Sequence, residues 1–130
     1  FIKKAAAGLA VAGFLPLSKK TMADEVKITK TLMHNVFFWL KEPKNEAHKK
    51  QLLQGLNQLL KVKNIKMSHL GFPAGTENRD VVDHSYSVSY MVMFDNQADQ
   101  DAYQIDPIHL KFVKENSHLW SKVIVYDSVN

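Results

Sequence analysis

The segment from Lys30 to Leu40 constrains the fold more than any other part of this 130-residue chain. Its length and apolar content predict a β-strand, in which alternate side chains point to opposite faces. One face would carry His34, Val36, Phe38 and Leu40, and the other would carry Met33, Asn35, Phe37 and Trp39. Because both faces are largely apolar, the strand is expected in the middle of a sheet, covered on both sides. The helices of so short a chain can cover one side, so a partner subunit is expected on the other.

The rest of the chain predicts a helix and three further strands around this segment. Leucines at helical spacing predict a helix over 46–61, with Asn45 as its N-cap. Alternating apolar residues predict strands over 64–70, 85–94 and 122–129.

A second helical region is expected between the last two strands. The pair Asp95-Asn96 can cap a helix over 97–104, and Asp106 can cap another that begins at Pro107 and continues to about Ser117. The resulting order is strand, helix, strand, strand, helical region, strand. This order predicts an α+β, ferredoxin-like βαββαβ fold with a four-stranded antiparallel sheet.

Residues 1–23 have the composition of an export signal. Two lysines form a positive start, and residues 5–17 form an apolar stretch that is too short to span a bilayer. Small residues before Asp24 fit a cleavage site. Export to the periplasm is therefore expected, with membrane contact through this leader alone, and the folded domain is expected over 24–130.

The leader resembles signals of the twin-arginine type. Its apolar stretch is rich in alanine and glycine, and Lys19 and Lys20 precede the cleavage region. The arginine pair of such a signal would have to lie upstream of Phe1. An amphipathic N-terminal helix or a lipid-surface anchor is the alternative interpretation.

Charge and cysteine content narrow the possible partners. The formal net charge is +4, but four of the 17 basic residues lie in the first 20 positions, ahead of every acidic residue. The remaining 13 basic residues are matched by 13 acidic ones, so the domain lacks the basic surface that nucleic acid requires.

The absence of cysteine excludes disulfides and thiolate metal sites. The histidines lack the helical i, i+4 ligand spacing, and neither a metal nor a cofactor is expected.

Several spaced features between 31 and 129 resemble the stress-responsive A/B barrel (Dabb) family. The first strand places His34 ahead of an apolar run that ends in a lysine, as family members do. The family motif Tyr-x-x-His-Pro-x-His-x-x-Phe is matched, apart from Asp106 in place of the first histidine, by Tyr103, Pro107, His109 and Phe112. The resemblance implies a homodimer whose two sheets pack face to face as a dimeric α/β barrel.

The resemblance also implies a cofactor-free site around Tyr103 and His109. In catalytic members of the family, a tyrosine and a histidine at these positions act together on a polyketide chain without a metal. A histidine suits proton abstraction next to a carbonyl, and a tyrosine hydroxyl can hold the enolate oxygen. His34 is expected to point into the same cavity and to orient the substrate. A purely structural role is the alternative for all three side chains.

The expected ligand site is an apolar cavity between the sheet and the helices. Its lining is expected to include Val36, Phe38, Tyr86 and Val88, and so few polar anchors favour a small apolar or polyketide-like ligand. Two other interpretations stay open. One is a non-catalytic stress or assembly protein with a packed interior, and the other is a dimeric barrel of the cofactor-free monooxygenase type.

Overall fold

The computed structural model describes residues 30–130, so the leader expected over 1–23 lies outside the described residues. The elements follow one another as β1 (Leu32–Leu40), α2 (Glu46–Leu59), β2 (Met67–Gly71), β3 (Val88–Phe94), α3 (Gln97–Gln104), α4 (Pro107–Asn116), a 3-10 turn η1 (Ser117–Leu119) and β4 (Trp120–Val129). The strands form a four-stranded sheet in the order β2-β3-β1-β4, and every neighbouring pair is antiparallel. The predicted α+β ferredoxin-like fold is therefore confirmed.

Each helix begins where the sequence predicts a cap. The side-chain oxygen of Asn45 accepts a hydrogen bond from the His48 amide at 3.1 Å. Asn96 caps α3 in the same way, and Asp106 caps α4 by accepting from the Ile108 amide at 2.8 Å. These bonds satisfy amides that have no partner inside the helix, and they fix where each helix starts.

Two strands are shorter than the sequence predicts. The segment over 64–70 enters the sheet only at Met67, because turns that follow α2 occupy the positions before it. The segment over 85–94 enters the sheet only at Val88, because the chain bends at Ser87. This bend changes the direction of the side chains that precede β3.

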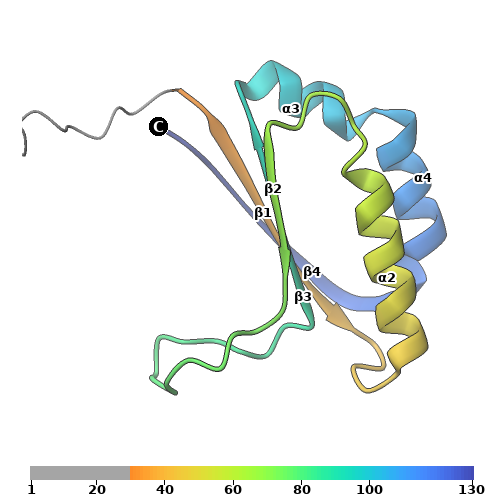
Figure 1. Ribbon diagram of the computed structural model, residues 1–130, viewed down its shortest axis with the longest axis vertical. Coiled ribbons are helices and arrows are strands. Elements are labelled where there is room, and N and C mark those ends of the chain that lie inside the picture. The colour runs from red at the N-terminus through yellow and green to blue at the C-terminus, as the bar shows by residue number, and fades with distance from the viewer. Residues whose placement is uncertain (1–29) are drawn as a thin grey trace, which may run out of the picture.

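The three helices of the described residues, α2, α3 and α4, lie on one face of the sheet (Figure 1). The β1 residues on that face are at most 6% exposed. Leu52, Leu56 and Leu59 of α2 pack against them, and each is at most 2% exposed. Burial of one such leucine contributes about 1.5–3 kcal/mol by transfer from water.

The opposite face of the sheet is apolar and is not covered by any described helix. Its β1 residues, Met33, Asn35, Phe37 and Trp39, are only partly buried. Phe37 contacts the rings of Tyr86 and Tyr126, with ring centroids 5.1 and 6.1 Å apart. The loop between β2 and β3 projects on this same side (Figure 1). We call this surface the open face.

Candidate functional site

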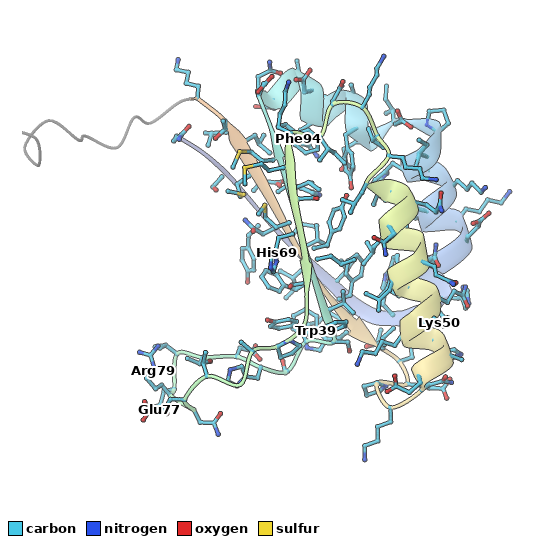
Figure 2. All side chains as sticks on the ribbon, in the orientation of Figure 1. Trp39, Lys50, His69, Glu77, Arg79 and Phe94 are labelled. Carbon is cyan, nitrogen blue, oxygen red and sulfur yellow. The ribbon has the colours of Figure 1, made fainter. Side chains whose placement is uncertain are left out.

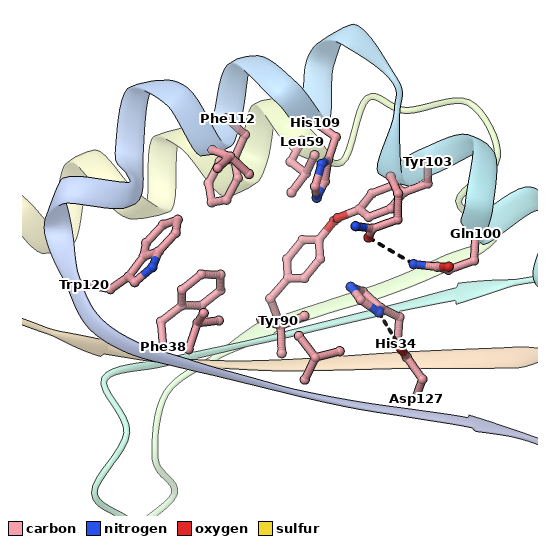
Figure 3. Close-up of a pocket in the computed structure, with 15 residues that line it drawn as sticks. His34, Phe38, Leu59, Tyr90, Gln100, Tyr103, His109, Phe112, Trp120 and Asp127 are labelled. Atoms are coloured by element: carbon pink, nitrogen blue, oxygen red, sulfur yellow. Dashed lines mark hydrogen bonds and ion pairs between the residues drawn. The ribbon is translucent and has the colours of Figure 1, made fainter.

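A cavity of about 490 Å³ lies between the sheet and the helices α3 and α4. Figure 3 shows that its lining changes from aromatic side chains at one end to polar side chains at the other. At the aromatic end, Phe112 and Trp120 stack with their ring centroids 5.8 Å apart, and Phe38 lies 5.0 Å from Trp120. This end suits a flat or branched apolar group.

His34 and Asp127 form a partly buried dyad at the polar end. His34 lies on β1 and Asp127 lies directly opposite it on β4. The Nδ1 atom of His34 is 2.5 Å from Oδ1 of Asp127. Because an ionised carboxylate can only accept, the proton of this bond belongs to Nδ1. Figure 3 shows the other ring nitrogen of His34 directed into the cavity.

Two tyrosine hydroxyls meet beside this dyad. Tyr90 of β3 and Tyr103 of α3 are each 1% exposed, and their hydroxyl oxygens are 3.1 Å apart. Burial raises the pKa of Tyr103 to about 12, although its bond to Tyr90 acts in the opposite direction. Burial and the neighbouring Tyr103 also raise the pKa of Tyr90 well above its usual value. Both hydroxyls therefore stay protonated at neutral pH and can donate hydrogen bonds.

His109 enters the polar end from α4. Its ring lies 4.8 Å from that of Tyr103, centroid to centroid, and it points down into the cavity (Figure 3). Burial, together with the charge of His34, lowers the pKa of His109. The Gln104 carbonyl and Asp106 oppose this effect more weakly. No hydrogen bond of acceptable geometry reaches its buried Nδ1 from the described residues.

This arrangement places two imidazoles and two hydroxyls around one end of an otherwise apolar cavity. A histidine with a lowered pKa is neutral at physiological pH and can accept a proton. Protonated tyrosines can stabilise an oxygen on which negative charge develops. The chemistry available at this end is therefore proton transfer next to a carbonyl or hydroxyl group.

The cavity opens along the edge strand β4. Val123 and Val125 of this strand are 41% and 45% exposed, although they face the same side of the sheet as the core residues of β1. The side chain of Asp127 is 47% exposed, whereas that of its partner His34 is 7% exposed. A ligand can thus enter past Asp127 and reach the buried groups behind it.

Residues 32–130 match the family model described as the stress responsive A/B barrel domain, Dabb. This match covers more than half of the chain. The chain belongs to the Dabb family. A search of curated proteins finds no match.

Several solved structures share the fold of this Dabb chain at low sequence identity. A Dabb family protein from Mesorhizobium loti is 20% identical with a TM-score of 0.64, over 78% of this chain and 98% of its own. A dimeric ferredoxin-like protein of unknown function from Thermobifida fusca is 14% identical with a TM-score of 0.65, over 82% and 98%. The hydroxynitrile lyase from Passiflora edulis is 21% identical with a TM-score of 0.65, over 78% and 94%.

The Dabb motif residues lie together in the structure. Tyr103, His109 and His34 line one end of the cavity, and the predicted Val36 and Phe38 line it as well. Asp106, which replaces the first histidine of the family motif, caps α4 and so fixes the helical turn that carries His109.

Two predicted lining residues lie elsewhere. Val88 is fully buried in the core and does not line the cavity. The expected position of Tyr86 is wrong, because this residue lies on the open face. The bend at Ser87 ends the alternation of β3, and the Tyr86 ring packs against Phe37 and Trp39, with centroids 5.1 and 6.4 Å away.

Sequence reasoning missed several residues of the polar end. Tyr90 lies two residues after Val88 on β3, so the alternation of this strand already places it on the cavity side. Asp127 follows Val123 and Val125 on the same face of β4. Gln100 and Gln104 are four residues apart on α3 and bond to each other at 3.0 Å. The alternation of side chains along β3 and β4 could have placed Tyr90 and Asp127 on the cavity side, but the contacts that they make depend on strand register.

The described part of the chain gives little support for a metal site of histidine and carboxylate ligands or for a membrane-spanning helix. Within residues 30–130, no three histidine, cysteine, aspartate or glutamate side chains are grouped closely enough to hold a metal ion. No helix of this region has the length and apolarity needed to cross a membrane.

The lowered pKa of His109 gives a direct test of the site. In an NMR pH titration, the His109 ring should titrate with a midpoint below the usual 6.5, because burial and His34 disfavour its protonated form. His34→Gln should raise this midpoint, since it removes one of the two causes. Because folding lowers this pKa, the contribution of His109 to stability should be lost as the pH falls from 6.5 through the folded-state midpoint.

The matched control is Tyr86→Phe, which alters a ring on the open face and should leave the His109 midpoint unchanged. A midpoint at or above 6.5 in the native protein would contradict the geometry described for this residue.

Proposed function

We propose that this Dabb protein binds a small, largely apolar or polyketide-like carbonyl compound and catalyses a cofactor-free proton transfer on it. The observation that carries the proposal is the convergence of His109, His34 and Tyr103 at the polar end of a mainly apolar cavity. Pockets for small ligands commonly combine an apolar lining with a few convergent polar groups.

In this proposal, one end of the cavity binds the apolar part of the ligand and the other end carries out the chemistry. The aromatic end, formed by Phe38, Phe112 and Trp120, would hold the apolar part of the ligand. A volume of about 490 Å³ lies within the range of small-molecule sites, about 300–1,000 Å³. The carbonyl group would then lie among the histidines and tyrosines.

His109 is the proposed general base. Its lowered pKa keeps it neutral and able to accept a proton at physiological pH. The Tyr103 hydroxyl would donate to the carbonyl oxygen as negative charge develops there, and Tyr90 would hold that hydroxyl in position. His34, oriented by Asp127, would position the substrate from the sheet side.

One solved structure that shares this fold is a hydroxynitrile lyase, and we propose lyase-type chemistry as one form of this proton transfer. The alternative of a non-catalytic protein with a packed interior is less well supported, because the cavity reaches both Tyr103 and His109. The monooxygenase-type alternative involves the same dimeric barrel but has no specific observation in its favour.

A proton-exchange assay tests the proposed chemistry with acetophenone as the probe. The native protein should accelerate exchange of the methyl protons for deuterium in D₂O, followed by NMR, because these protons lie next to a carbonyl. His109→Ala should lower this rate by on the order of 100-fold or more, as expected for loss of a general base. Tyr103→Phe should also lower it, through loss of the oxyanion donor.

Two controls make the exchange result interpretable. Tyr86→Phe lies outside the cavity and should exchange at the native rate. His109→Ala should keep nearly the native melting temperature, whereas a large loss would assign His109 to the scaffold. Equal exchange by native protein and His109→Ala would refute the proposed base.

We also propose that the protein is a homodimer through the open face. Half-buried Phe37 and Trp39, together with Tyr126 at 62% exposure, give this face an apolar aromatic surface. Similar structures from Thermobifida fusca and from Bacteroides fragilis are described as dimeric. A second copy packed on this face would remove the apolar surface from water.

Phe37→Lys tests this dimer. The substitution places a charge at the centre of the open face, so sedimentation velocity should show the mass of one chain in place of two. Its circular dichroism spectrum should stay native, because Phe37 points away from the helix-covered core. Leu110→Lys, at a 56% exposed position on α4, is the matched control and should remain dimeric. A native protein that sediments as a monomer at micromolar concentration would exclude the dimer.

Export to the periplasm completes the proposal. It rests on the composition of residues 1–23, with two lysines ahead of a short apolar stretch. Fractionation of cells that express the full precursor should find the mature chain outside the cytoplasm, and recovery in the cytoplasm alone would exclude export.

A further inference from the structure

Four of the five methionines of the chain lie on the open face. They are Met33 on β1, Met67 on β2, and Met91 and Met93 on β3. Figure 2 shows the sulfur atoms, in yellow, gathered on the side of the sheet away from the helices. This concentration of thioethers plays no part in the cavity on the other side.

Three of these methionines form a continuous row across neighbouring strands. Met93 of β3 is directly opposite Met33 of β1 on one side and Met67 of β2 on the other. Side chains directly opposite each other on antiparallel strands have Cβ atoms about 4.5–5.5 Å apart. The flexible methionine side chains can therefore bring their sulfur atoms together above Met93.

A histidine lies in the next row of the same face. His69 of β2 is directly opposite Met91 of β3, and each is two residues away from a methionine of the first row. Figure 2 shows His69 on the side of the sheet that carries the sulfur atoms. Its side chain is exposed, as is that of Met67, so both can change rotamer to reach a bound ion.

The donor set selects a soft cation. Thioethers bind Cu(I), whereas Mg²⁺, Ca²⁺ and Mn²⁺ prefer carboxylate and carbonyl oxygens. None of the paired strand positions on the open face carries an aspartate or a glutamate. With one histidine and no cysteine, the face also lacks the ligands of an ordinary zinc site.

We propose that the methionine row of Met33, Met93 and Met67 binds Cu(I), with His69 as a further nitrogen ligand. The site lies on the opposite side of the sheet from the cavity, so it is independent of the proposed proton-transfer reaction. In a homodimer the rows of two copies would lie in the same interface, and one ion for each chain or one for each pair of chains fits the proposal. The rival explanation is that the methionines serve only as adaptable apolar packing.

Anaerobic competition with bicinchoninate measures the affinity of the full chain for Cu(I). The native protein should withdraw Cu(I) from this chelator, and Met93→Leu should weaken binding on the order of tenfold or more, because Met93 is central to the row. Leucine conserves the volume and apolarity of methionine, so the fold should persist. His69→Gln should weaken binding as well, while His84→Gln, in the loop beyond the sheet, should not.

Ag(I), a redox-inert substitute for Cu(I), gives a second readout. In protein labelled at the methionine methyl carbons, Ag(I) should shift the NMR signals of Met33, Met67 and Met93. Failure of the native protein to compete for Cu(I), or equal affinity of native protein and Met93→Leu, would overturn the site and leave the methionines as packing residues. Proton exchange on acetophenone can succeed or fail independently of this result.

Discussion

The two-sided burial of β1 is the constraint on which the rest of the structure depends. Successive side chains of a strand point to opposite faces of the sheet. The sequence of β1 therefore fixes which of its residues face the helices and which lie on the open face. A shift of register by one residue would turn His34 outward and push Phe37 under the helices. Pairing with β3 on one side and β4 on the other prevents such a shift. The same strand thereby fixes a cavity residue and the centre of the open face.

The polar end of the cavity is assembled from every layer of the fold. The sheet contributes the His34–Asp127 dyad and Tyr90, and the helices contribute Tyr103 and His109. Apart from the half-exposed Asp127, these groups are polar and mostly buried, so each would destabilise the core if it had no compensating interaction. The bond within the dyad and the bond within the tyrosine pair provide this compensation, whereas the Nδ1 atom of His109 has no partner among the described residues.

One sheet thus separates two chemically different surfaces. On the helix side, aromatic rings and hydrogen-bonding side chains favour an organic ligand with a carbonyl or hydroxyl head. On the open face, the aromatic rings around Phe37 favour a protein partner, and the neighbouring methionines favour a soft cation. Because neighbouring residues of a strand point to opposite sides, His34 and Met33 belong to different sites although they are adjacent in sequence.

The sequence by itself determined the element order, the three helix caps and the two faces of β1, because these depend on local spacing and local hydrogen bonds. It also placed Tyr103, His109 and His34 at one cavity. Only the tertiary structure decided that Tyr86 leaves the cavity side, since a bend at Ser87 interrupts the alternation. Strand register likewise decided that Asp127 meets His34 across 93 positions of chain, because such a pairing depends on the packing of whole elements and has no local signature.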